Sequence, residues 1–82
     1  MYYTYLIRSL SHPNQTYVGF THDLKIRIAA HNAGGSAHTS KFLPWQLEFY
    51  AAFRTQERAL AFEHYLNSHS GHAFAKRDLG LS

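Results

Sequence analysis

The first pattern with chemical content joins an arginine and a histidine to two aliphatic residues at helical spacing. Leu24, Arg27, Ile28 and His31 follow the i, i+3, i+4, i+7 pattern and would share one face of a helix. A guanidinium beside a core stripe is costly unless it is paired or faces a cleft. Arg27 and His31 are therefore candidates for binding an anion. An arginine at the edge of the stripe and a hydrogen-bonded histidine near the helix end would explain the pattern without any function.

A second expected helix carries the opposite charge in the same arrangement. Ala59, Phe62, Glu63 and Leu66 would share one face, which places the Glu63 carboxylate on an otherwise apolar stripe. If the two polar faces converge over a sheet, two interpretations are open. Glu63 forms a structural ion pair with Arg27, or it holds a divalent cation while Arg27 meets a phosphate. A carboxylate with few protein partners suits magnesium, which keeps several waters.

Two tyrosines lie on adjacent strands of an expected hairpin. Tyr5 is near the middle of the first strand, and Tyr17 is in the second, two residues before Gly19. Hairpin tyrosines are usually core residues. A tyrosine hydroxyl that reaches a reacting water can also act as a general acid or base. Gly19 has no side chain and leaves room for a ligand or another backbone to approach.

These residues require elements that hold them in place. Alternating and apolar runs predict three strands, at residues 2–10, 16–20 and 45–53. Helical spacing predicts three helices, at about residues 22–33, 56–68 and 73–78. Thr21 and Thr55 are the expected N-caps, and Gly34 and Gly71 are the expected breakers. The order β-β-α-β-α-α predicts an α+β fold, with a small three-stranded antiparallel sheet flanked by helices.

Length and composition limit the remaining possibilities. The chain has 82 residues, and we expect one domain over residues 1–82. It has no Cys, which excludes disulfides, thiolate zinc sites and a cysteine nucleophile. A net charge of +3 favours a nucleic-acid partner only mildly. We expect neither a signal peptide nor a membrane span, and therefore a cytoplasmic protein with no membrane partner.

Several short motifs follow one another in a recognisable order. They are Tyr3-Thr4-Tyr5, Tyr17-Val18-Gly19, Leu24-Lys25-Ile26-Arg27 with His31-Asn32, His38-Thr39-Ser40-Lys41, Pro44-Trp45 and Ala59-Leu60-Ala61-Phe62-Glu63. This ordered set resembles the GIY-YIG nuclease superfamily, in its short branch where the nuclease module makes up almost the whole protein. The resemblance covers roughly residues 2–78.

The resemblance implies a metal-dependent endonuclease that hydrolyses DNA phosphodiester bonds, of the kind used in DNA repair. It implies that one of the two tyrosines, Tyr5 or Tyr17, takes the proton of the attacking water while the other orients that water or contacts the phosphate, and we favour Tyr5 as the base. Arg27 would bind the scissile phosphate, and His31 would hydrogen-bond the same region. Glu63 would hold a single divalent ion, Mg²⁺ or Mn²⁺.

The chain departs from the family pattern at a few positions. Tyr3 and Thr4 stand where the family name has Gly and Ile, Ile26 occupies a place where many relatives are basic, and Asn67 stands where a Lys is common. None of these changes removes a core catalytic group. The fold and the proposed chemistry are therefore expected to be retained.

The expected substrate is DNA rather than RNA, cut with a preference for structure over sequence. Further contacts to the substrate are expected from Gly19, Lys25, Lys41, Lys76 and Arg77. A homodimer, a protein partner or the shape of the substrate would supply specificity. Two alternatives remain: a non-catalytic nucleic-acid-binding module with the same fold, and a protein-interaction domain with a structural Arg27–Glu63 pair.

Overall fold

The computed structural model describes residues 1–81, and Ser82, the last residue of the predicted domain, lies outside the described residues. The elements are β1 (Tyr2–Ser9), β2 (Thr16–Thr21), α1 (Leu24–Asn32), a short 3₁₀ helix (Ser40–Phe42), β3 (Trp45–Phe53), α2 (Gln56–Leu66) and α3 (His69–Asp78). This order confirms the predicted α+β fold. Within residues 1–81, no helix is both long and apolar enough to cross a membrane.

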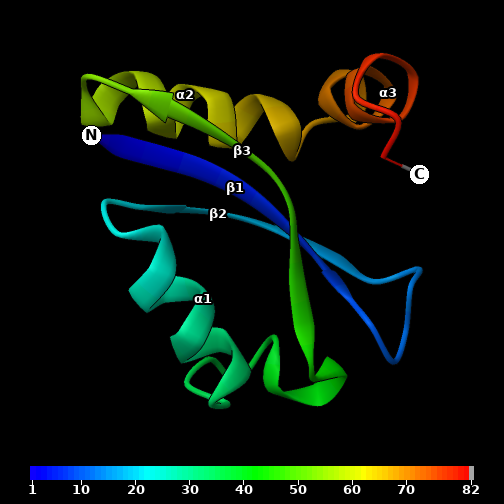
Figure 1. The fold of residues 1–82 in the computed structure, drawn as a ribbon. Helices are drawn as coiled ribbons and strands as arrows, with labels where there is room; N and C mark the ends of the chain where they lie inside the picture. The colour runs from blue at the N-terminus through cyan, green and yellow to red at the C-terminus, as the bar shows by residue number, and fades with distance from the viewer. Residues whose placement is uncertain (82) are drawn as a thin grey trace.

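The sheet places β1 at its centre. The strand order is β2-β1-β3, and both neighbours run antiparallel to β1 (Figure 1). In this register Tyr5 lies opposite Gly19 on β2 and opposite Tyr50 on β3. The edge strand β2 therefore carries Gly19 directly beside the central tyrosine.

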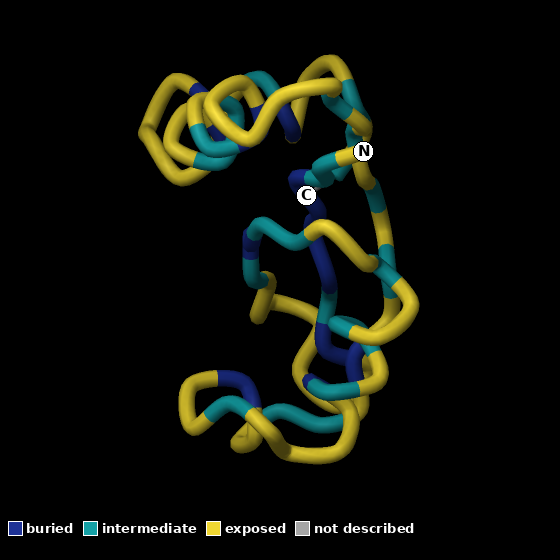
Figure 2. The backbone as a smooth tube through the Cα atoms, turned by 90° about the vertical axis from the view of Figure 1, so that its left-hand side faces the viewer, coloured by how far each residue is buried: buried dark blue, intermediate teal, exposed yellow. Residues whose placement is uncertain are grey.

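Alternate residues of β1 point into two different helical layers, because successive side chains of a strand face opposite sides of the sheet. On one side, Tyr5 and Ile7 pack with Trp45 and with Leu24 and Ile28 of α1. We call this side the α1 layer. On the other side lies the α2–α3 layer, formed by Leu6, Val18, Leu66, Phe49, Phe62 and Phe74. Figure 1 shows α1 and α2 on opposite faces of the sheet, and Figure 2 shows buried positions along its centre.

Helix α1 begins at Leu24, about two residues later than predicted. The N-cap is Asp23 and not Thr21, because the Asp23 carboxylate accepts a hydrogen bond from the backbone N–H of Ile26. The Thr21 hydroxyl instead accepts a hydrogen bond from the N–H of Asp23. The end of α1 is as predicted, since Gly34 follows it with a φ of +78°.

The C-terminal helix is longer than predicted, and Gly71 does not break it. Helix α3 begins at His69 after a Ser68 N-cap, so Gly71 lies within its first turn. A Cβ at Gly71 would overlap the backbone carbonyl of Tyr65 at the end of α2. Gly71 therefore permits close packing between α2 and α3. The prediction that this glycine ends a helix is wrong. The predicted Thr55 N-cap of α2 is confirmed.

Candidate active site

The Tyr5 hydroxyl is the centre of a buried polar cluster in the α1 layer. The Tyr5 side chain is completely buried. Its oxygen lies 2.8 Å from Nε2 of His31 and 3.3 Å from Nε of Arg27, which donates to it. Arg27 and His31 reach it from α1, on the helix face that also presents Leu24 and Ile28 to the core. The predicted sharing of one face by these α1 residues is therefore correct.

Gly19 makes room for the tyrosine. The Tyr5 ring leans across β2, and a Cβ at position 19 would overlap the Tyr5 hydroxyl. The sequence predicts that this space admits a ligand or another backbone, but Tyr5 itself occupies it. The absence of a side chain at Gly19 thus determines where the Tyr5 oxygen lies, directly above the edge strand.

Tyr17 lines the same region without being fully buried. Its ring centroid lies 6.4 Å from that of Tyr5, 5.2 Å from that of His31 and 5.7 Å from that of His38. His38 comes from the loop between α1 and the 3₁₀ helix and is exposed. The two tyrosines and the two histidines therefore form one aromatic wall beside Arg27.

The electrostatic environment keeps both Tyr5 and His31 uncharged near neutral pH. Burial raises the pKa of the Tyr5 phenol, opposed by the Arg27 hydrogen bond and positive charge, while negative charge at Tyr17 and Glu63 raises it further. Burial, and then the positive charge of Arg27, lower the pKa of the His31 imidazole. The hydrogen bond to Tyr5 raises the pKa of Arg27. The resting cluster thus holds a phenol and a neutral imidazole beside one cation.

Glu63 comes from α2, the helix that covers the face of the sheet opposite to α1 (Figure 1). It is half-buried on α2, whose neighbouring residues Phe62 and Leu66 pack in the α2–α3 layer. The helices that carry Arg27 and Glu63 therefore do not lie over the same face of the sheet, which is the arrangement considered above. The structural Arg27–Glu63 pair is also wrong, because the two ion pairs within residues 1–81 are Arg8–Glu48 and Arg77–Asp78. The Glu63 charge nevertheless acts on the pKa of Tyr5.

The donor set fits a hard cation only in a restricted form. Residues 1–81 contain no cluster of three or more His, Asp or Glu side chains able to hold a metal ion. Within the same range, no hydrogen bond or ion pair to the Glu63 carboxylate is found, so both oxygens are available. One carboxylate suits Mg²⁺ or Mn²⁺ that keeps its waters and takes other ligands from a phosphate. It does not suit an ion held by protein groups alone.

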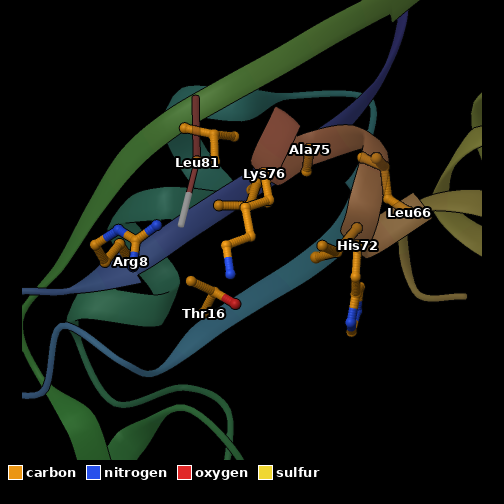
Figure 3. Close-up of a pocket in the computed structure, with 9 residues that line it drawn as sticks. Arg8, Thr16, Leu66, His72, Ala75, Lys76 and Leu81 are labelled. Atoms are coloured by element: carbon orange, nitrogen blue, oxygen red, sulfur yellow. The ribbon is translucent and has the colours of Figure 1, made fainter. Parts of the chain in front are cut away.

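The other predicted substrate contacts are not brought together. Lys25 lines an open hollow between α1 and β3, on the flank of α1 away from Arg27. Lys41 is exposed in the 3₁₀ helix, and Arg77 pairs with its neighbour Asp78. Lys76 borders a cavity of about 210 Å³ in the α2–α3 layer and extends toward Thr16 (Figure 3). These cations thus lie on several surfaces of the molecule.

Sequence reasoning assigned no role to Thr39, which completes the buried cluster. Its side chain is completely buried, and its Oγ1 lies 2.8 Å from Nδ1 of His31. The Thr39 carbonyl accepts a hydrogen bond of 2.8 Å from Nε1 of Trp45, which fixes the loop. Thr39 falls in a polar loop with no periodicity, so only its place beside His38 within a recognised motif could have indicated it.

Comparison with known proteins places this fold and site in a family. Residues 1–77 match the GIY-YIG catalytic domain. A UPF0213 protein of Lacticaseibacillus paracasei is 38% identical over 72 residues, covering 87% of this chain and 79% of that protein. The chain therefore belongs to the GIY-YIG family, as the motifs predict.

Two longer relatives carry a functional name. The structure-specific endonuclease subunit SLX1 homolog of Giardia intestinalis is 38% identical over 66 residues, which are 76% of this chain and 18% of that protein. The structure-specific endonuclease subunit SLX1 of Malassezia globosa is 39% identical over 67 residues, or 77% of this chain and 15% of that protein. The chain thus spans less than a fifth of either SLX1 protein.

Proposed function

We propose that this protein is an endonuclease that hydrolyses phosphodiester bonds in DNA. One observation carries the proposal: the Tyr5 hydroxyl is held between Nε2 of His31 and Nε of Arg27, above an edge strand that has no side chain at Gly19. A proton donor and acceptor beside a guanidinium is the arrangement that attack of water on a phosphate needs. The family match and the names of the SLX1 relatives support a nuclease.

The proposed reaction begins when Arg27 turns from Tyr5 to the scissile phosphate. The 3.3 Å hydrogen bond from Nε of Arg27 is the longer of the two hydrogen bonds to the Tyr5 oxygen. While it is formed, the Arg27 side chain occupies one side of that oxygen. Once Arg27 bonds the phosphate, the Tyr5 oxygen is open to a water molecule. Arg27 then offsets the negative charge that develops on the phosphate oxygens in the transition state.

Tyr5 acts as a proton shuttle because its resting state is a phenol and not a phenolate. The water oxygen forms a bond to phosphorus as the bond to the leaving oxygen breaks, and the leaving oxygen keeps that electron pair. Tyr5 takes the water proton and passes its own proton to Nε2 of the neutral His31. The leaving oxygen takes a proton from solvent, and Tyr17 orients the attacking water from the aromatic wall.

Glu63 is the residue that would hold the metal ion. A bound Mg²⁺ or Mn²⁺ supplies positive charge that stabilises the phosphate oxygens. The Glu63 carboxylate would contribute one oxygen ligand and neutralise part of the ion's charge.

The proposed substrate is branched or otherwise distorted DNA. Both SLX1 relatives are named structure-specific endonuclease subunits. We propose that a partner or a second copy of this chain adds specificity, and that Lys25 and Lys41 contact flanking phosphates without reading sequence. Lys76 and Arg77 would contact DNA only if it extends over the α2–α3 layer.

The decisive experiment measures cleavage of branched, nicked and single-stranded DNA with and without Mn²⁺. Glu63→Gln and Arg27→Gln should each abolish metal-dependent cleavage. Glu57→Gln and Arg58→Gln are the controls, because each removes an exposed charge on α2 of the same sign as that of Glu63 or Arg27, respectively. Both variants should retain metal-dependent cleavage. Binding without cleavage by the unaltered protein would instead identify a non-catalytic nucleic-acid-binding module, and equal activity of all four variants would disprove the proposed site.

A further inference from the structure

We propose that Thr39 is a positioning residue that fixes the tautomer of His31, so that Nε2 is free to accept the Tyr5 proton. The proposal rests on the proposed function and extends it to a residue outside α1 and the hairpin. Three completely or almost completely buried side chains form the chain Tyr5–His31–Thr39, with 2.8 Å at each contact. A neutral imidazole has one donor and one acceptor nitrogen, so these two contacts must differ in direction.

Hydrogen-bond directions in the cluster start from Arg27. A guanidinium only donates, so Nε of Arg27 uses a lone pair of the Tyr5 oxygen. The Tyr5 O–H is buried and needs an acceptor of its own. Within residues 1–81, the other partner of this hydroxyl is Nε2 of His31. If Tyr5 donates to Nε2, the His31 proton lies on Nδ1 and is donated to Oγ1 of Thr39.

The opposite arrangement is chemically weaker. In it, Thr39 donates to Nδ1, Nε2–H donates to Tyr5, and the phenol oxygen faces two donors with its own proton unpaired. In the favoured arrangement the proton without an acceptor within residues 1–81 is that of the Thr39 hydroxyl, which is the weaker of the two donors. A phenol, with an ordinary pKa near 10, is a stronger hydrogen-bond donor to an imidazole lone pair than an aliphatic alcohol. The threonine hydroxyl also rotates freely to suit its surroundings, whereas conjugation holds the phenol O–H near the ring plane. Both arguments favour Nδ1–H.

The position of Thr39 is itself fixed by the loop that follows α1. Its carbonyl accepts from Nε1 of Trp45, and Asn32 at the end of α1 clamps the same Trp45. The Asn32 side chain accepts from the N–H of Trp45 at 2.6 Å and donates to its carbonyl at 3.0 Å. The hydroxyl that meets Nδ1 is therefore held to both α1 and β3.

The tautomer can be measured directly, in the resting protein and without a substrate. The ¹⁵N chemical shifts of the two ring nitrogens report which one carries the proton. His31→Gln identifies the His31 signals among the seven histidines. Nδ1–H is expected in the unaltered protein and in Thr39→Ser, which keeps the hydroxyl. In Thr39→Val, the proton should move to Nε2, because a buried Nδ1–H would have no acceptor.

Cleavage assays then test the consequence for the reaction. Thr39→Val should lower kcat by roughly 10- to 100-fold without changing KM, because general acid–base catalysis contributes that much or more. Thr39→Ser should stay near the unaltered rate. In a His31→Gln background, Thr39→Val should cause no further loss, since Thr39 acts only through His31. A higher KM with an unchanged kcat in Thr39→Val would overturn the proposal.

The NMR result separates this proposal from the proposed function. Nε2–H in the unaltered protein, or an unchanged tautomer in Thr39→Val, overturns the role of Thr39 even if DNA is cleaved. Nδ1–H in a protein that cleaves no DNA leaves the tautomer assignment standing and removes the proposed function. If Thr39→Val does not fold, the unaltered protein and Thr39→Ser still decide the direction of the hydrogen bonds.

Discussion

The two layers of this small sheet are built from alternate residues of one strand, yet they differ in kind. In the α1 layer, Tyr5 enters a chain of buried polar groups through His31 to Thr39. In the α2–α3 layer, the buried polar residue of β1 is Thr4, whose hydroxyl donates to the carbonyl of Ala59. That hydrogen bond pairs one helix carbonyl, and it is not part of a longer chain of buried polar side chains within residues 1–81. The rest of the layer consists of aliphatic and phenylalanine side chains.

This difference places the proposed proton transfer in the α1 layer, whereas α2 contributes Glu63 and apolar packing. A buried hydrogen-bonded chain contributes little net stability for each bond, whereas leaving one of its members unpaired is costly. Apolar packing contributes in proportion to the area buried. A change in the α1 layer should therefore affect the reaction as well as the fold, whereas a change in the apolar packing of the α2–α3 layer should affect mainly the fold.

The largest expected effect on the α1 layer comes from removing a single oxygen atom. Tyr5→Phe deletes the proposed proton shuttle and should lower cleavage by roughly 10²- to 10⁴-fold. The protein should remain folded, because the ring still fills the same space. Tyr50→Phe is the matched control, since Tyr50 lies opposite Tyr5 on β3 and is exposed. Equal rates for the two variants would remove Tyr5 from the reaction.

The two close-packed glycines offer a symmetrical test of the comparison. Gly19→Ala places a methyl group against the Tyr5 hydroxyl, which must move. A displacement of about 1 Å in a reacting group can cost roughly 10²-fold in rate. We therefore expect cleavage to fall strongly with a modest loss of thermal stability, measured on the same preparation.

Gly71→Ala is the counterpart in the other layer. Its methyl group would overlap the backbone carbonyl of Tyr65, which cannot rotate away as a side chain can. Overpacking of this kind typically costs about 1–3 kcal/mol in the free energy of unfolding. Cleavage per folded molecule should stay unchanged. A strong fall in kcat for Gly71→Ala, with stability retained, would mean that the packing of the α2–α3 layer does not affect mainly the fold.

The sequence predicts the elements well because their signals are local. Apolar alternation and helical spacing identify β1 and α1, and Thr55 caps α2 as its side chain predicts. Gly71 was misread because a glycine in a helix has two explanations, a break or a close contact with a neighbouring element. Only the packing of α3 on α2 decides between them.

Only those parts of the site that depend on local spacing or on the motif order could be predicted from the sequence. Spacing on α1 places Arg27 and His31 on one face, and the motif order adds Tyr5 and Glu63. Spacing cannot show that α2 lies across the sheet from α1, because the side of a sheet that a helix covers depends on the chain crossover. The contact between His31 and Thr39 joins a helix to an irregular loop, where neither periodicity nor propensity gives a signal.

A smaller effect should appear in the pH dependence of stability. Burial lowers the pKa of His31 in the folded protein below its ordinary 6.5. Between that lowered pKa and 6.5, the unfolded chain binds more protons than the folded chain. The free energy of unfolding should therefore fall as the pH falls through this window, and cleavage should fall as His31 becomes protonated.

Denaturant unfolding at several pH values from 7.5 to 5 measures the slope of the free energy of unfolding against pH, which equals the difference in bound protons between the unfolded and folded chains multiplied by 2.303RT. His31→Gln should flatten it. His72→Gln alters an exposed histidine of α3 in the α2–α3 layer and should leave it in place. If both variants keep the slope of the unaltered protein, His31 does not change its protonation on unfolding.

The smallest effect concerns the cations around the two layers. Lys41 follows Thr39 by two residues in the loop that closes the α1 layer, whereas Lys76 borders the cavity of the α2–α3 layer (Figure 3). DNA bound at Arg27 should release about one counterion at a phosphate that Lys41 contacts. Lys41→Gln should therefore reduce the slope of log Kd against log salt by about 1 and weaken binding a few-fold.

Lys76→Gln removes the same charge from the opposite side of a molecule whose shortest dimension is 17 Å. It should leave the salt slope unchanged if DNA does not extend over the cavity that Lys76 borders. An equal reduction by both variants would mean that the nucleic acid passes around the edge strand β2 and touches both layers. That path would also pass α2, which carries Glu63, so both layers would contribute to binding as well as to the proposed reaction.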